Sequence, residues 1–225
     1  MKSIRMKTVI IVIPLMLAAV LLMKKKDMSY RQSVLKSMYP LIMLPGKVFG
    51  SKNAIQKNTN HIHPIVDFYS LKIVLNDGRI LDVNQFKGKK IILVNTASDC
   101  GYTAQYAELE KLYQQHKENL VIIGFPANDF KEQEKKDDAA IAEFCKINYG
   151  VTFYLAKKSQ VIKGTEQNPV FNWLSNQEKN GWCNQEPKWN FCKYLVDGNG
   201  VLTHFFAQSV SPLDPQVIDE VKIQN

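Results

Sequence analysis

Two continuous apolar runs separated by a helical segment constrain the fold of this 225-residue chain more than any other feature. Residues 89–97 (KKIILVNTA) and 119–125 (NLVIIGF) lack the polar alternation of a half-exposed strand, which is typical of strands buried on both faces. The segment between them, residues 101–117, has one apolar face at helical spacing, formed by Tyr106, Leu109, Leu112 and Tyr113. A strand, a helix and a second buried strand therefore follow one another here.

The flanking segments complete an α/β pattern. Residues 66–83 predict a β-hairpin with an Asp77-Gly78 turn. Helices are expected over residues 137–150, which begin with Asp and end with Gly, over residues 168–179, and over residues 211–224. Two strands surround the DGNG turn within residues 191–206. This order of elements predicts a central mixed sheet flanked by helices.

The N-terminal segment favours a membrane. Thr8–Met23 contains no charged residue over 16 positions and is followed by Lys24, Lys25 and Lys26. A helix of that length spans about 24 Å, and snorkelling lysines bring it close to the thickness of a bilayer core. The alternative, a cleaved signal peptide, needs a small-residue cleavage site after the run, where this chain has lysines. We therefore expect residues 1–26 to be an uncleaved single-pass anchor. Basic residues flank both ends, so the side of the membrane stays undecided.

Residues 27–64 show no clean periodicity and are expected to be a juxtamembrane segment and linker before a domain over residues 65–225. Residues 39–50 are apolar, and they fit either a segment along the membrane interface or a disordered tether. His61 and His63 have the spacing of a metal-binding pair, but no third ligand lies nearby in the sequence. We expect no metal and no cofactor.

The charge is concentrated at the N-terminus. The net charge is +8, yet residues 1–57 hold 11 Lys/Arg and 1 Asp/Glu, while the remainder holds 18 and 20. The expected domain is therefore slightly acidic, which argues against a nucleic-acid partner. A basic segment beside a membrane explains the excess.

Cys100 is the candidate nucleophile among the four cysteines, Cys100, Cys145, Cys183 and Cys192. No two of them are three positions apart, so zinc-ribbon and CxxC patterns are absent. Cys100 falls where a buried strand ends and a helix is expected to begin. Unpaired N–H groups and the helix dipole at such a site lower the pKa of a thiol, so the sequence predicts a reactive thiolate.

Three segments resemble the glutathione peroxidase family in its Cys-containing, non-selenium form. They are VNTASDCGYTAQYAELEKLY (residues 94–113), GFPANDFKEQE (124–134) and WNFCKYLVDGNG (189–200). The resemblance covers about residues 66–221 and implies a thioredoxin-like fold. It also implies reduction of hydrogen peroxide and of organic or lipid hydroperoxides.

By this resemblance, Cys100 is the peroxidatic cysteine, and Gln133, Trp189 and Asn190 complete a catalytic tetrad. All three partners carry side-chain N–H donors, which favour a thiolate and stabilise charge on a departing oxygen. The chain departs from the family in having Ala127 where a cysteine often follows GFP. It also carries Asp129 near the site and Tyr154 where proline is usual.

The resemblance leaves two routes to regenerate Cys100. Cys145 lies near the position of the resolving cysteine of thioredoxin-dependent members, and glutathione is the other reductant. Ile141, Phe144, Cys145 and Asn148 share a helical face, which fits a core position for Cys145 equally well. Cys183 or Cys192 could resolve instead. We expect a monomer.

Other functions on related folds lack their signatures. A membrane-tethered thiol–disulfide oxidoreductase needs CxxC, but Thr103 stands three residues after Cys100. A typical peroxiredoxin needs Pro and Thr at positions 93 and 97, where this chain has Leu93 and Ala97. A metal chaperone needs a second cysteine at Ala104. A peroxide-consumption assay separates the first hypothesis from these alternatives.

Overall fold

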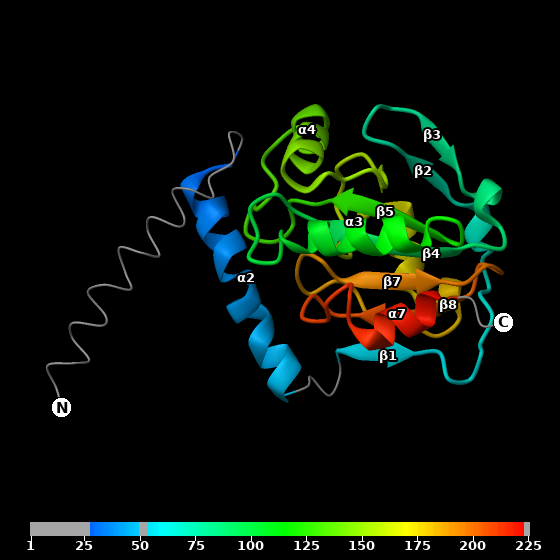
Figure 1. Ribbon diagram of the computed structural model, residues 1–225. Helices are drawn as coiled ribbons and strands as arrows, with labels where there is room; N and C mark the ends of the chain where they lie inside the picture. Colours follow the sequence, from blue (N-terminus) through cyan, green and yellow to red (C-terminus); the bar gives the residue numbers. More distant parts are fainter. Residues whose placement is uncertain (1–27, 50–53, 223–225) are drawn as a thin grey trace, which may run out of the picture.

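The structure is a computed structural model that describes residues 28–49 and 54–222, with side chains for all of these except residues 45–49. A six-stranded sheet forms its centre, in the order β1-β8-β7-β4-β5-β6 (Figure 1). These strands are β1 (Ile55–Lys57), β4 (Lys90–Thr96), β5 (Leu120–Pro126), β6 (Tyr154–Leu155), β7 (Lys193–Val196) and β8 (Leu202–Phe206). The sheet is mixed, because β4, β5 and β6 run parallel while the pairs β4–β7, β7–β8 and β1–β8 are antiparallel.

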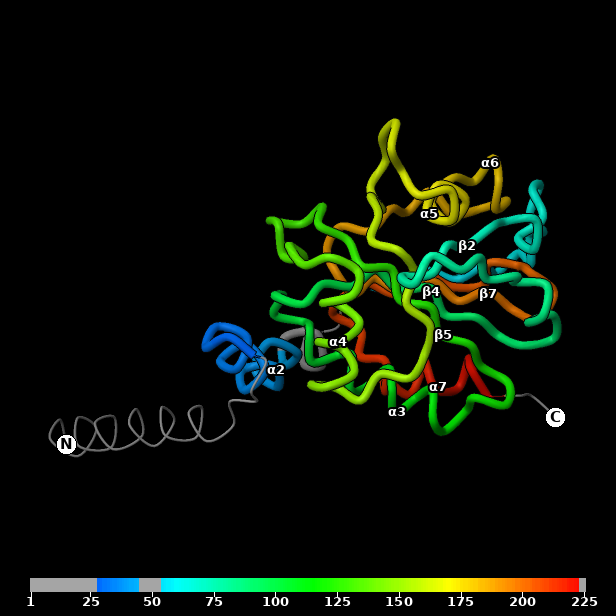
Figure 2. The backbone as a smooth tube through the Cα atoms, turned by 90° about the horizontal axis from the view of Figure 1, so that it is seen from above, coloured from blue at the N-terminus to red at the C-terminus, as the bar shows by residue number. Residues whose placement is uncertain are grey.

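Helices cover both faces of this sheet (Figure 2). The helices are α2 (Tyr30–Phe49), α3 (Gln105–His116), α4 (Asp138–Tyr149), α5 (Pro169–Leu174), α6 (Gln177–Asn180) and α7 (Pro215–Val221). The short 3-10 helices are Phe68–Ser70 and Val83–Phe86, and β2 (Lys72–Val74) pairs with β3 (Ile80–Asp82) as a separate hairpin. Figure 2 places α5, α6 and this hairpin on one side of the sheet and α3, α4 and α7 on the other.

The apolar run of β4 has partners on both faces. Ile91 and Leu93 are buried in the hydrophobic cluster on the α5 side, together with Trp173. Ile92 and Val94 are buried in the cluster on the α3 and α4 side. Successive side chains of a strand point to opposite faces, so a strand between two cores must be apolar throughout. The prediction of a mixed sheet flanked by helices is confirmed.

The element boundaries differ from the prediction at two helices. The helix expected from residue 101 begins only at Gln105, and residues 100–104 form turns instead. The helix expected over residues 168–179 is two helices, because α5 ends at Leu174 and Asn176 caps α6 through a bond from the N–H of Glu178. The hairpin has its predicted turn, with Gly78 at φ +85°.

The prediction for residues 27–64 needs two corrections. Residues 30–49 form helix α2, in which Tyr39 and Met43 are buried against the domain. Residues 55–57, expected in a linker, form β1, which pairs with β8 in the central sheet. The domain therefore extends further toward the N-terminus than residue 65. Periodicity did not reveal α2 because apolar residues occupy two of its faces.

The predicted anchor, residues 1–26, lies outside the described residues. Within residues 28–49 and 54–222, no helix combines the length and the apolar character that crossing a membrane requires.

Candidate active site

Cys100 lies in a tight turn between the end of β4 and the start of α3. The Thr103 hydroxyl organises this turn, since it accepts from the N–H of Cys100 at 2.9 Å and donates to the carbonyl of Ala97 at 2.9 Å. The side chain of Cys100 is 1% exposed. Four residues separate it from the first residue of α3, so the predicted position at a helix N-terminus is corrected to a turn ahead of the helix.

Three donors approach the Cys100 sulfur. The N–H of Tyr102 lies 3.4 Å from it, and the side chains of Trp189 and Asn190 act as donors that lower the pKa of the thiol. Burial nevertheless raises the pKa of the thiol above its ordinary value of 9.0, and the three donors offset only part of that effect. The predicted lowering of this pKa is therefore corrected, although the donors themselves are present.

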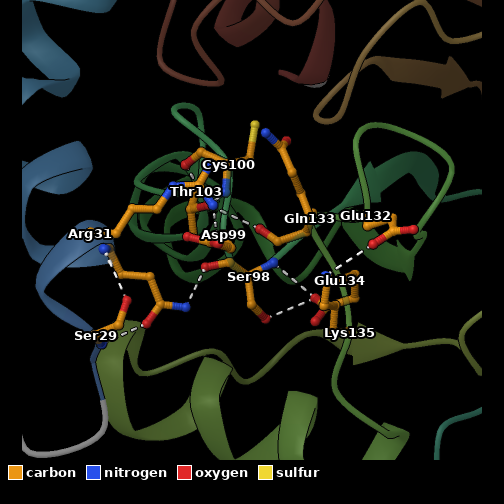
Figure 3. A network of polar contacts seen from close by, with 12 residues as sticks. Ser29, Arg31, Ser98, Asp99, Cys100, Thr103, Glu132, Gln133, Glu134 and Lys135 are labelled. Carbon is orange, nitrogen blue, oxygen red and sulfur yellow. Dashed lines mark hydrogen bonds and ion pairs between the residues drawn. The ribbon is translucent and has the colours of Figure 1, made fainter.

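Gln133 reaches the same place from the loop that follows β5. In Figure 3 its amide end and the Cys100 sulfur point toward one another. Its Oε1 accepts from Nδ2 of Asn190 at 3.0 Å, and its backbone carbonyl accepts from the N–H of Asp99 at 3.0 Å. The structure thus brings Cys100, Gln133, Trp189 and Asn190 together from three separate segments of the chain.

Trp189 is half-buried at the mouth of the site. Its ring lies 5.9 Å from that of Phe130, and Nζ of Lys131 sits 5.5 Å from its centroid. The indole N–H of Trp189 is one of the donors that lower the pKa of the Cys100 thiol. Substituting phenylalanine would keep a ring in this place and remove only the donor.

Asn95, near the end of β4, holds the segment that carries Trp189 and Asn190. The side chain of Asn95 donates from Nδ2 to the carbonyl of Trp189 at 3.0 Å and accepts at Oδ1 from the N–H of Cys192 at 3.0 Å. The backbone carbonyl of Asn95 accepts from the N–H of Phe191 at 2.6 Å. Phe191 has φ +71°, a conformation that costs a non-glycine residue free energy. The sequence analysis assigned no role to Asn95, although it is a polar residue in an apolar strand and lies in the motif of residues 94–113.

A buried carboxylate fixes the loop before Cys100. Glu134 is fully buried, and its Oε2 accepts from both the N–H and the hydroxyl of Ser98 at 2.8 Å (Figure 3). Burial raises the pKa of Glu134, and the bonds from Ser98 counteract this. The adjacent residue is Gln133, so this contact holds the Cys100 and Gln133 loops in register. The sequence analysis missed it as well.

Asp129, whose role the sequence left open, supports the next loop along the chain. Its Oδ2 accepts from the N–H of Val161 at 2.8 Å. Burial raises the pKa of its carboxyl group, while the bonds from the N–H groups of Val161 and Ile162 lower it. Its contacts are therefore to the backbone of a neighbouring loop.

Cys145, the expected resolving residue, lies in the middle of α4 and is fully buried. Burial raises its pKa to about 12, and the nearby hydroxyl of Tyr106 counteracts only part of this effect. The ring of Tyr106 in turn lies 5.3 Å from that of Phe191, next to Asn190 in the chain. All four cysteines are free thiols. The predicted core-facing position of Cys145 is confirmed.

Helix α4 is closed by caps at both ends. Asp137 accepts from the N–H of Ala140, and Gly150 at φ +67° donates to the carbonyl of Lys146. Asn148 donates from Nδ2 to the carbonyl of Phe144 at 3.0 Å. Asn148 and Gly150 therefore both form hydrogen bonds that stabilise the C-terminal end of the helix.

The two remaining cysteines lie elsewhere in the core. Cys183 belongs to the cluster on the α5 side, and burial raises its pKa to about 11. Cys192 is also fully buried, with its sulfur 3.6 Å from Oε1 of Gln208. His61 and His63 are both exposed. Over residues 28–49 and 54–222, no group of three or more His, Cys, Asp or Glu side chains is placed to hold a metal.

Comparisons with known proteins place the chain in one family. Residues 68–175 match the family model described as glutathione peroxidase. A glutathione peroxidase-like peroxiredoxin of Chlamydomonas reinhardtii is 44% identical over 154 residues, which cover 67% of this chain and 94% of the relative. A glutathione peroxidase of Lactococcus lactis is 39% identical over 70% of this chain and 98% of the relative.

A solved structure supports the fold. The crystal structure of "Trgpx in apo form" is 33% identical, has a TM-score of 0.54, and covers 70% of this chain and 94% of its own. The mixed sheet with helices on both faces is thus a thioredoxin-like α/β fold, as the resemblance implied. By its sequence, its fold and the residues gathered around Cys100, this chain belongs to the glutathione peroxidase family.

Proposed function

We propose that this thiol peroxidase reduces hydrogen peroxide and organic or lipid hydroperoxides at Cys100. The observation that carries the assignment is the set of hydrogen-bond donors around one buried sulfur. These donors are the N–H of Tyr102 and the side chains of Trp189 and Asn190. Gln133, hydrogen-bonded to Asn190, completes the group.

The first step forms one bond and breaks one bond. The Cys100 thiolate attacks a peroxide oxygen, the O–O bond breaks, and an S–O bond forms. The leaving oxygen takes up a proton and departs as water or an alcohol. Sulfur loses two electrons and the peroxide gains them. The donors stabilise both the thiolate and the charge that develops on the leaving oxygen.

Regeneration proceeds through Cys145 and thioredoxin. The thiolate of Cys145 attacks the sulfenic acid of Cys100, which forms a disulfide and releases water; a dithiol then reduces the disulfide. A disulfide needs Cα atoms about 4.4–6.8 Å apart, and Cys145 is buried in the middle of capped α4. The helix must therefore unwind locally before the bond forms. Glutathione is the alternative reductant and needs no such motion.

Residues 1–26 anchor the enzyme in a membrane. The support is the sequence alone: the uncharged run Thr8–Met23 bracketed by Lys7 and Lys24. An apolar helix of this length fits a bilayer core when flanking lysines snorkel.

Replacement of the nucleophile tests the assignment. Cys100→Ser should abolish peroxide consumption in a single turnover, because an alcohol is far less nucleophilic than a thiolate. Cys183→Ser is the matched control, since Cys183 is equally buried but lies in the cluster on the α5 side. It should consume one equivalent of peroxide at the rate of the unmodified protein. Activity retained by Cys100→Ser would exclude this mechanism.

A further inference from the structure

Helix α2 is bound to the domain along one face. Nε2 of Gln32 donates to the carbonyl of Ser98 at 3.0 Å, and the hydroxyl of Tyr39 donates to Oε2 of Glu108 at 2.8 Å. Arg31 forms an ion pair with Asp99, and Nζ of Lys36 lies 4.6 Å from the ring centroid of Tyr149. The side chains on this face of α2 therefore pack against the domain or bond to it.

The opposite face of α2 is apolar and exposed. Its side chains are spaced by four, three and three residues, so they form one stripe along the helix. They are Val34 (38% exposed), Met38 (46%), Leu41 (57%) and Leu44 (52%). We call these four residues the outer stripe. An exposed apolar stripe of this kind is typical of a surface that contacts an apolar partner.

We propose that the outer stripe of α2 lies in the interface of a lipid bilayer. The chain geometry favours this occupant, given the proposed anchor. The uncharged run ends at Met23 and α2 begins at Tyr30, which leaves six residues between them. Six extended residues span at most about 20 Å. A chain whose run Thr8–Met23 is in a membrane therefore holds the start of α2 close to the surface of that membrane.

The net charge of the segment that follows the run fits anionic lipid headgroups. Between the end of the run and the end of α2, the sequence carries one acidic residue, Asp27. Of the basic residues in this stretch, Arg31 and Lys36 contact the domain, and the others are Lys24, Lys25, Lys26 and Lys47. Basic residues beside an apolar helical face are typical of helices that lie in the plane of a membrane interface. A second copy of this chain would gain nothing from such a charge excess, because the two copies would repel each other.

This placement would bring the peroxidatic cysteine close to the membrane. Both neighbours of Cys100 touch α2, since Asp99 pairs with Arg31 and a Cβ on Gly101 would lie 3.3 Å from Cδ1 of Ile42. A helix with its side chains is about 10–12 Å across. The bilayer surface would then lie about one helix diameter from the Cys100 turn. The importance of this closeness for catalysis rests on the proposed function.

Fluorescence quenching in vesicles tests the proposal. The full chain is reconstituted into vesicles of phosphatidylcholine and phosphatidylglycerol, with an encoded fluorescent amino acid in place of Leu41. Ile80, 65% exposed on β3 at the end of the molecule away from α2, provides the matched control position (Figure 1). Lipids that carry a nitroxide near the headgroup should quench the probe at position 41 several-fold more than the probe at position 80.

The possible results separate this inference from the other proposals. Equal quenching at both positions, or none at position 41, overturns it, whether or not the chain floats with the vesicles. Absence of quenching together with a dimeric mass in detergent would assign the stripe to a second copy. Peroxide consumption is measured on the same samples. If it fails while position 41 is quenched, the catalytic proposal falls and the membrane contact stands.

Discussion

The sulfur of Cys100 is subject to two opposing effects. Burial disfavours the thiolate, while the N–H of Tyr102 and the side chains of Trp189 and Asn190 favour it. Burial prevails, so the resting thiol has a pKa above 9.0 and is protonated at neutral pH. The donors then contribute most when negative charge forms, on the sulfur and on the leaving oxygen.

A pH profile checks this balance. Because the pKa of Cys100 is raised above 9.0, the thiolate fraction keeps growing with pH through neutrality. The single-turnover rate of peroxide consumption should therefore rise through pH 9 (the ordinary thiol pKa) and not level off earlier. A plateau reached below pH 7 would contradict the dominance of burial.

Removing one donor should slow the reaction and shift this profile. Trp189→Phe keeps a ring beside Phe130 but loses the indole N–H, so we expect the rate to fall on the order of 10²-fold and the pKa of Cys100 to rise further. Trp182→Phe is the control, because its indole donates to the carbonyl of Leu202 at 2.7 Å in the cluster on the α5 side. Equal rates and profiles for the two variants would remove the donor role of Trp189.

The residues of the site differ in how far the sequence could reveal them. Cys100, Gln133, Trp189 and Asn190 stand in motifs that resemble a known family, and the structure brings all four together. Asn95, Thr103 and Glu134 stand in the same motifs, but their role could not be predicted, because they bond backbone groups that only the folded chain brings near them. The pKa of Cys100 was mispredicted for the same reason, since burial is a tertiary property.

At the scale of elements, α4 combines a core position for Cys145 with a proposed need to unwind. Asp137 at its N-terminus and Gly150 at its C-terminus both hold it closed. Closure protects Cys145, whose pKa of about 12 makes it a poor nucleophile in place. Unwinding would release the thiol from burial and lower this pKa toward its ordinary value. The same motion would therefore bring Cys145 near Cys100 and make its thiol more nucleophilic.

Weakening the N-terminal cap tests this coupling. Asp137→Ala removes the bond to the N–H of Ala140, which typically costs a helix about 1 kcal/mol. If unwinding limits disulfide formation, the Cys100–Cys145 bond should form up to about fivefold faster after peroxide, as followed by peptide mapping. Asp214→Ala, which removes the equivalent cap of α7, should leave the rate unchanged.

Two other results would redirect the resolving role. A linkage of Cys100 to Cys183 or Cys192 in the same peptide map would transfer it to that cysteine, and glutathione adducts alone would favour the glutathione route. Oxidation should also raise hydrogen exchange across α4 while β4 and β5 stay protected. Unchanged exchange in α4 would exclude unwinding.

Elements with a continuous apolar run, or with one apolar helical face and capping residues, were predictable from the sequence. The strands β4 and β5 and the helix α4 have clear apolar patterns and capping residues, and they appear close to their expected bounds. Helix α2 was missed because its domain-facing residues and its outer stripe together obscure the period of 3.6. Strand β1 is only three residues long, and its pairing with β8 depends on segments about 150 positions apart.

At the scale of the whole molecule, helix α2 lies outside the part of the chain that matches the family but contacts the catalytic domain. The relatives cover about two thirds of this chain, and the family model begins at residue 68. Helix α2 lies ahead of that match, yet it contacts both neighbours of Cys100. Helix α2 is thus joined to the loop that carries Cys100 by direct contacts.

The final prediction concerns the proposed membrane anchor, residues 1–26. The full chain should stay in the membrane fraction after a carbonate wash, because Thr8–Met23 buries 16 uncharged residues. Leu15→Arg places a charge at the centre of the run, at a cost of about 2.5–3.5 kcal/mol for insertion, and should move a large share of the protein to the wash. Leu15→Val is the matched control and should behave as the unmodified chain. If the N-terminus of the membrane-expressed protein maps just after Met23, the run is a cleaved signal and the proposed anchor is wrong.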